Sequence, residues 1–70
     1  MIRKGTNVKW KWAKGEAYGK VVDTFQETVT KIIKGNEVTR HGEKGNRVLL
    51  IRQEDGDEVL KLEQTVERAK

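Results

Sequence analysis

Strict alternation of apolar and polar residues marks the start of the chain. In "TNVKWKW", residues 6–12, Val8, Trp10 and Trp12 share one parity and polar residues hold the other. Successive side chains of a β-strand point to opposite faces, so this pattern predicts a strand with one face on a core. Trp10, in mid-strand, is expected in that core. Trp12 ends the strand beside a glycine-bearing stretch, and the pattern leaves it either in the core or at its rim.

The middle of the chain predicts further strands separated by turns. "AKGEAYG", residues 13–19, is expected to be a loop. "KVVDTFQETV", residues 20–29, predicts a strand that bends, because its apolar residues do not keep one parity. "VTKII" and "EVTRH" predict a hairpin with Gly35-Asn36 as its two-residue turn, since such turns favour residues that tolerate a positive φ.

The last third predicts a second hairpin and a short tail. "RVLLIRQ", residues 47–53, has four apolar residues in succession, as expected of a central strand buried on both faces. "EDGDE" predicts a tight turn after which "VLKL" pairs back, and residues 63–70 predict one or two helical turns. The fold class is therefore all-β: a small SH3-like barrel of about five strands with a short C-terminal helical turn. An OB-like barrel is the alternative.

Composition places the chain among small soluble domains. Its 70 residues, 34% of them hydrophobic, predict a single domain over 1–70 that needs nearly every large apolar side chain in its core. The absence of cysteine excludes disulfides and thiolate metal sites. No segment has the apolar length of a signal peptide or a membrane span. We expect a cytoplasmic monomer that uses no membrane.

Catalytic chemistry has little support in this sequence. Serine and cysteine are absent, and His41 is the only histidine, so the usual nucleophile–base pairs cannot form. "GEAYGK", residues 15–20, is one residue short of a phosphate-binding loop and lacks the following Ser or Thr. "EDGDE", residues 54–58, is too short for a calcium loop. We therefore expect no enzyme activity, no metal and no small-molecule cofactor.

Charge is unevenly distributed along the chain. Residues 1–20 hold six Lys or Arg against the single Glu16, whereas residues 53–70 hold six acids against three basic residues. A positive face formed by the first third would suit a nucleic acid. Aromatic side chains beside it would stack on bases, and Trp12, Tyr18 and Phe25 supply the residue types for a small aromatic pocket. The candidate ligand-binding residues are Lys9, Lys11, Trp12, Lys14, Tyr18 and Lys20.

These residues support two hypotheses from different classes. The first is a non-enzymatic binding module that contacts nucleic acid weakly and in a salt-sensitive manner through its basic N-terminal strand. The second is a protein-interaction module that captures a peptide in an aromatic pocket or adds a partner's strand to an open edge. Salt discriminates between them, because pocket capture of a peptide survives high ionic strength far better.

Four stretches of the chain, in order, resemble a known family. "KGTNVKWKW", "GKVVDTF", "VTKIIKGNEVTRHG" and "LLIRQEDGDEVLKL" cover roughly residues 4–66 and are similar to the hypervirulence-associated protein TUDOR-domain family. The resemblance implies a small Tudor-like or SH3-like barrel. It supplies no catalytic or binding residues that transfer to this chain.

Overall fold

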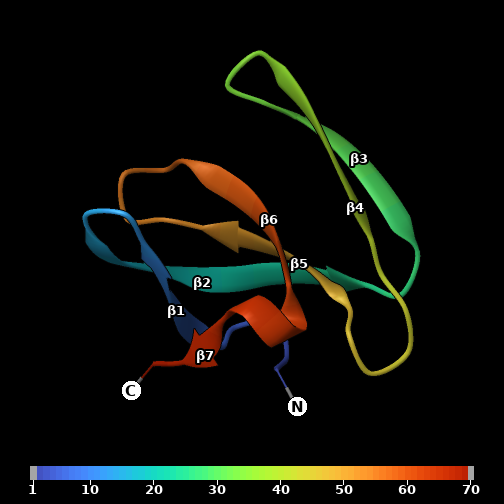
Figure 1. Cartoon of the computed structure of the whole chain (residues 1–70), viewed down its shortest axis with the longest axis horizontal. Helices are drawn as coiled ribbons and strands as arrows, with labels where there is room; N and C mark the ends of the chain where they lie inside the picture. Colours follow the sequence, from blue (N-terminus) through green and yellow to red (C-terminus); the bar gives the residue numbers. More distant parts are fainter. Residues whose placement is uncertain (1, 70) are drawn as a thin grey trace.

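The computed structural model describes residues 2–69 and contains seven strands and one short 3-10 turn (Figure 1). The elements are β1 (Asn7–Trp12), β2 (Gly15–Phe25), β3 (Thr28–Ile33), β4 (Asn36–His41), β5 (Val48–Arg52), β6 (Glu58–Leu62), η1 (Glu63–Thr65) and β7 (Glu67–Arg68). The all-β fold class predicted from the sequence is confirmed. The strand count is seven instead of about five, partly because the two-residue β7 carries no apolar alternation that would reveal it.

Two sheets make up the fold. Five strands form one antiparallel sheet in the order β6-β5-β2-β1-β7, and β3 and β4 form a hairpin of their own. The helical turn predicted over residues 63–70 is confirmed only at η1; residues 67–68 are instead extended and pair with β1, and residue 70 lies outside the described residues. The C-terminal segment thereby covers the edge of β1, which would otherwise be open to another chain.

Two connections between strands differ from their predictions. Residues 13–19 are not a loop: Trp12 lies opposite Gly15, so only two residues join β1 to β2. In the β3–β4 hairpin Ile33 lies opposite Asn36, so the turn is Lys34-Gly35 and not Gly35-Asn36. Both turn residues have positive φ values, 51° and 80°, as a two-residue hairpin turn of type I′ requires. Lys34 accepts this conformation because the strand pairing on either side fixes the register.

One face of the five-stranded sheet carries the main core. Val8, Val21, Leu49 and Ile51 are almost completely buried there, and Trp10 is only 8% exposed, as predicted. Ile2 and Val66, from the two ends of the chain, complete this cluster. Lys61 of β6 places its Nζ 5.7 Å from the centre of the Trp10 ring, which shows that the sheet curls until β6 approaches β1.

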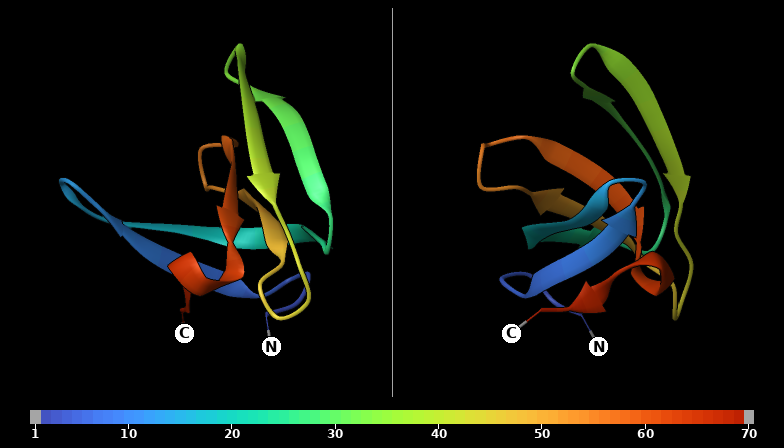
Figure 2. Two further views of the ribbon diagram at one scale, coloured as in Figure 1. Left: turned by 45° about the vertical axis from the view of Figure 1, so that its right-hand side comes forward. Right: turned by 60° about the vertical axis from the view of Figure 1, so that its left-hand side comes forward.

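The opposite face of the sheet is covered over β5 and β6 only. Val48 and Leu60 are buried there, opposite in parity to Leu49 and Ile51, so β5 is buried on both faces as its continuous apolar run predicts. The β3–β4 hairpin packs on this side with β4 next to β6, as the left-hand view of Figure 2 shows. Lys31 of β3 pairs with Glu58 of β6 at 3.8 Å across the contact.

The predicted bend of the second strand coincides with a register shift in β2. Between Val21 and Asp23 the pairing with β5 slips by one residue, so Val22 is the extra residue. A bulge of this kind bends the strand and changes which side chains face the core. The bulge explains why the apolar residues of β2 change parity. Val21 faces the main core with Ile51, whereas Phe25 faces the opposite side with Val48.

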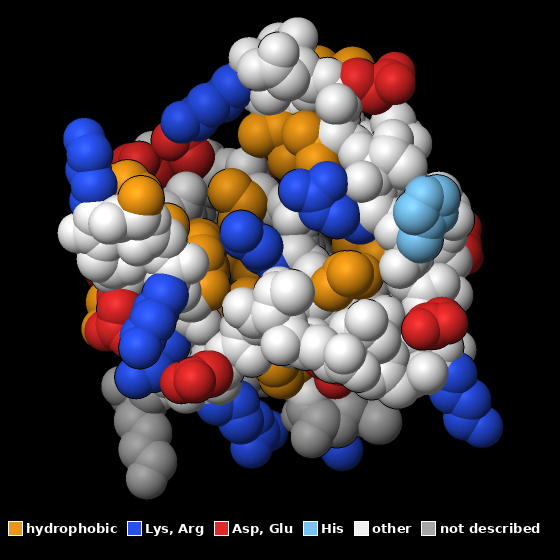
Figure 3. Space-filling model, in the orientation of Figure 1, with side chains coloured by type: hydrophobic (Ala, Val, Ile, Leu, Met, Phe, Trp, Pro, Cys, Tyr) orange, Lys and Arg blue, Asp and Glu red, His pale blue; other side chains and the backbone are white. Residues whose placement is uncertain are grey.

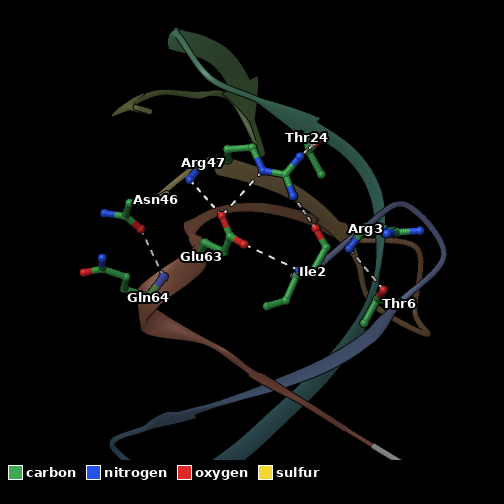
Figure 4. Close-up of polar contacts among 8 residues, drawn as sticks. All are labelled: Ile2, Arg3, Thr6, Thr24, Asn46, Arg47, Glu63 and Gln64. Carbon is green, nitrogen blue, oxygen red and sulfur yellow. Dashed lines mark hydrogen bonds and ion pairs between the residues drawn. The ribbon is translucent and has the colours of Figure 1, made fainter. Parts of the chain in front are cut away.

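A buried ion pair ties the two ends of the chain together (Figure 4). Arg47 Nε lies 3.5 Å from Glu63 Oε1, and each side chain is only 16% exposed. Glu63 also accepts hydrogen bonds from the backbone N–H of Arg47 at 3.0 Å and of Ile2 at 3.5 Å. Arg47 Nη2 donates to the Ile2 carbonyl at 2.6 Å and Nη1 to Thr24 Oγ1 at 3.4 Å.

This arrangement lowers the pKa of Glu63. Burial by itself raises the pKa of the Glu63 carboxyl, but the two backbone hydrogen bonds and the positive charge of Arg47 outweigh burial. The carboxylate therefore stays charged in a site that holds the N-terminal segment, the start of β5 and η1 together.

Candidate functional site

We call the sheet face opposite to the main core the outer face. Its uncovered half, over β1 and β2, holds most of the predicted site residues. Lys9 lies opposite Tyr18 and Lys11 opposite Glu16 in the β1–β2 pairing. Residues directly opposite each other in an antiparallel pair share a face. Lys20 follows Tyr18 by two residues and so lies on the same face, which is the face opposite to Val8 and Trp10.

Strand β5 extends this surface by one cation. Lys20 lies directly opposite Arg52, the last residue of β5. Together the five side chains form what we call the basic face: Lys9, Lys11, Tyr18, Lys20 and Arg52. The hairpin covers the other half of this same sheet face, over β5 and β6, and leaves the basic face in solvent.

Two of the predicted residues lie elsewhere. Trp12 has the parity of Trp10, and since it extends beyond the core it is 54% exposed on the opposite side of the sheet from Tyr18. Lys14 lies in the two-residue turn between β1 and β2. The predicted aromatic pocket is therefore wrong: Phe25 lies at the other end of β2, opposite Val48, and the three rings do not meet.

Acidic partners moderate the charge of the basic face. Glu16 Oε2 lies 4.0 Å from Lys9 Nζ, and Glu58 Oε2 lies 3.1 Å from Arg52 Nη2. The Tyr18 hydroxyl donates a hydrogen bond of 3.1 Å to Glu16 Oε1. This bond orients the Tyr18 ring, which is 53% exposed. Glu67 of β7 lies opposite Lys9 and shares this face as well, so the basic face holds four cations against three acids and keeps a small excess of positive charge.

A groove of about 580 Å³ lies in the basic face beside Tyr18. Its floor is the backbone of Val8 and Gly19, where β1 and β2 pair. Gly19 presents only its backbone to the groove; a Cβ added there would point to the core side and overlap the Ile51 side chain. The walls are formed by Asn7, Tyr18, Lys20, Val22, Arg52, Gln53, Glu54 and Ala69.

A second, smaller hollow shares part of the lining of the groove. Its volume is about 310 Å³, and Tyr18, Gln53, Glu54 and Asp55 line it. Tyr18, Gln53 and Glu54 line both spaces, whereas Lys20 and Arg52 line only the groove and Asp55 only the hollow. The groove therefore holds the cations, and the charged side chains of the hollow are both acidic.

Several groove residues escaped the sequence analysis. Arg52 has a usable signal, since it follows the buried Ile51 and must point to the other face, but its position beside Lys20 requires the strand order. Asn7 and Gln53 carry no pattern of their own. If Ala13-Lys14 is taken as the turn, Trp12 lies opposite Gly15. Counting three residues along each strand from that pair then places Lys9 opposite Tyr18.

The remaining charged groups are dispersed. On the face drawn in Figure 3, Lys and Arg side chains are spaced among Asp and Glu around a hollow with exposed hydrophobic side chains. Lys34, in the tip of the β3–β4 hairpin, lies 2.7 Å from Asp57, and this hydrogen-bonded pair raises the pKa of Lys34 and lowers that of Asp57. Within residues 2–69, no three His, Asp or Glu side chains are grouped to hold a metal, and no helix is long and apolar enough to cross a membrane.

Comparison with known proteins identifies one family. The family model described as "Hypervirulence associated proteins TUDOR domain" matches residues 5–66, which include strands β1 to β6. Neither a curated protein nor a solved structure matches the chain. The fold is thus Tudor-like, and Tudor-like domains are in general small binding modules.

Proposed function

This chain belongs to the hypervirulence-associated proteins TUDOR-domain family, and on that premise we propose that it is a non-enzymatic module that binds nucleic acid through the basic face. The observation that carries the proposal is the register of β1, β2 and β5, which lines up Lys9, Lys11, Lys20 and Arg52 beside one exposed aromatic ring. Cations in such a row contact successive phosphates, and their contribution does not depend on base sequence.

The expected binding is weak and strongly dependent on salt. Each phosphate neutralised on a single strand contributes about −0.7 to the slope of log affinity against log salt, so three to four contacts predict a slope of roughly −2 to −3. Raising the salt from about 50 to 200 mM would then weaken binding roughly 20- to 50-fold. Little preference among base sequences is expected.

The first test is an amide-correlation NMR titration with mixed-sequence RNA and DNA, at low and then moderate salt. Signals of β1, β2 and Arg52 are expected to shift and to return when salt is added. The triple variant Lys9→Ala, Lys11→Ala, Lys20→Ala is expected to lose binding. Its matched control removes the same charge elsewhere, at Lys31, Lys34 and Lys44. Equal loss of binding in both variants would show that only net charge matters, and the proposal would fail.

A protein-interaction module is the second candidate function. Two exposed apolar side chains outside the basic face favour it: Trp12 at 54% and Ile32 of β3 at 64% exposure. A peptide bound at either place would be held by apolar contact, so its affinity would change little when the salt is raised tenfold. Substitution of Trp12 by alanine would abolish peptide binding at that ring while leaving nucleic-acid binding intact.

A further inference from the structure

We infer that the groove beside Tyr18 receives one nucleotide of an unpaired strand, so that the module selects single-stranded over double-stranded nucleic acid. This inference rests on the proposed function and adds to it the kind of strand and the place where a base is held. It is supported by the groove, by the hydrogen bond that orients the Tyr18 ring, and by the charged side chains of the groove and of the second hollow.

The groove has the chemistry that a nucleotide requires. It combines one aromatic ring, two cations that lie opposite each other on neighbouring strands, and two carboxamides. Lys20 and Arg52 supply donors for a phosphate, with the planar guanidinium suited to paired hydrogen bonds. Asn7 and Gln53 offer both donors and acceptors, which match the edge of any base after small rotations.

The Tyr18 ring is accessible to a ligand. It is 53% exposed and lines both the groove and the second hollow. Its hydroxyl is fixed by the hydrogen bond to Glu16, which reduces the freedom that a stacked base would otherwise have to remove. An exposed ring held in place is the usual platform for an unstacked base.

Only an unpaired strand can use this platform. In a duplex each base is stacked on its neighbours and paired, so its flat face is not available to a protein ring. A duplex would contact Lys9, Lys11 and Lys20 through phosphates alone. The single strand therefore gains the stacking contact and the duplex does not.

Charge determines the path of the strand past Tyr18. Asp55 lines only the hollow and Glu54 lines both spaces, whereas Lys20 and Arg52 line only the groove, so a phosphate is attracted to the groove and repelled from the hollow. From the groove, the next cations on the same face are Lys9 and Lys11 of β1. The backbone is thus expected to run from Lys20–Arg52 toward β1 and away from the β5–β6 turn.

The test compares a fluorescein-labelled ten-nucleotide single strand of mixed sequence with its blunt duplex, by anisotropy in about 50 mM salt. We expect the wild-type chain to bind the single strand at least fivefold more tightly. Tyr18→Leu is expected to weaken single-strand binding about 5- to 100-fold and to leave duplex binding unchanged. Tyr18→Phe, which keeps the ring, should stay within about threefold of wild type. Trp12→Leu, the matched exposed aromatic on the other side of the sheet, should change neither affinity.

Different results overturn different parts of the argument. If the duplex binds as tightly as the single strand, or if Tyr18→Leu binds as wild type while the triple lysine variant does not, the nucleotide groove is refuted and the proposed function stands. If neither strand form binds, the proposed function fails and the groove inference fails with it. Because Tyr18 is half exposed, its variants should fold, and the Trp10 indole signal verifies this in the same samples.

Discussion

Replacement of Glu63 by glutamine tests what holds the chain ends on the sheet. The wild-type carboxylate accepts from the Arg47 backbone N–H, from Arg47 Nε and from the Ile2 backbone N–H. Glutamine has the same size but only one acceptor oxygen, and its NH₂ group would face an N–H donor. With the amide oxygen in the place of Oε1, the two Arg47 donors keep an acceptor, but the Ile2 N–H loses its own, and the Arg47 side chain, only 16% exposed, loses its negatively charged partner.

The expected loss of unfolding free energy is about 1–3 kcal/mol at pH 7, the usual contribution of a hydrogen-bonded charge that loses its partner. A 70-residue domain has a total stability of roughly 3.5–10 kcal/mol, so the loss is a large fraction of it. The melting temperature should fall by roughly 5–20 °C, since each kcal/mol corresponds to about 4–8 °C in a domain of this size. Arg47→Met combined with Glu63→Gln should cost less than the sum of the two single variants, because no buried charge is left unpaired.

The pH dependence gives an independent check of the same ion pair. The folded-state pKa of Glu63 is lowered, so its contribution to stability is fully present above the unfolded pKa of about 4.3 and is lost as pH falls through the folded value. The difference between wild type and Glu63→Gln should be constant near neutral pH. It should shrink below about pH 4, where the wild-type carboxyl becomes neutral as well.

Urea unfolding followed by tryptophan fluorescence measures both quantities, because Trp10 is buried in the folded state. Glu16→Gln serves as the control, since its pair with Lys9 is long at 4.0 Å and the Glu16 side chain is 38% exposed. That variant should stay within about 0.5 kcal/mol of wild type. The reasoning is refuted if Glu63→Gln is as stable as the control, or if its deficit does not change between pH 7 and pH 3.

Four further substitutions test the core, a close contact between strands and one turn, each by urea unfolding. Trp10→Ala should cost about 3–5 kcal/mol because the ring is buried, whereas Trp12→Ala should cost less than about 1 kcal/mol; equal losses would contradict the assigned faces. Gly19→Ala should destabilise by about 1–3 kcal/mol, since the new Cβ overlaps the Ile51 side chain, and an unchanged midpoint would show that the strands can separate there. Gly35→Ala should cost about 1 kcal/mol from backbone strain alone, because its φ is 80° and open space surrounds the Cβ position. A Gly35→Ala variant as stable as wild type would contradict the positive φ at Gly35 and the turn at Lys34-Gly35.

Local patterns in the sequence were sufficient for most of the strands and for the centre of the main core, but not for the first part of β2 or for β7. Alternation in residues 6–12 placed Trp10 inside, and the four apolar residues after Arg47 predicted the two-sided burial of β5. Both follow from the period of two along a strand, which needs no knowledge of what the strand packs against. The basic N-terminal third likewise follows from composition.

Register and coverage were decided only by the tertiary structure. A two-residue turn replaces the loop expected over residues 13–19 and sets the register of β1 and β2, so Trp12 and Tyr18, which were expected together, lie on opposite faces. The same pairing brought Arg52 beside Lys20, 32 positions away in the chain by residue number, and made the groove. Which half of the outer sheet face stays in solvent depends on where the β3–β4 hairpin packs. The sequence by itself determined most strands and the apolar faces of β1 and β5, because these depend on the alternation along one strand. The candidate site depends on contacts between strands, and only folding of the whole chain sets those.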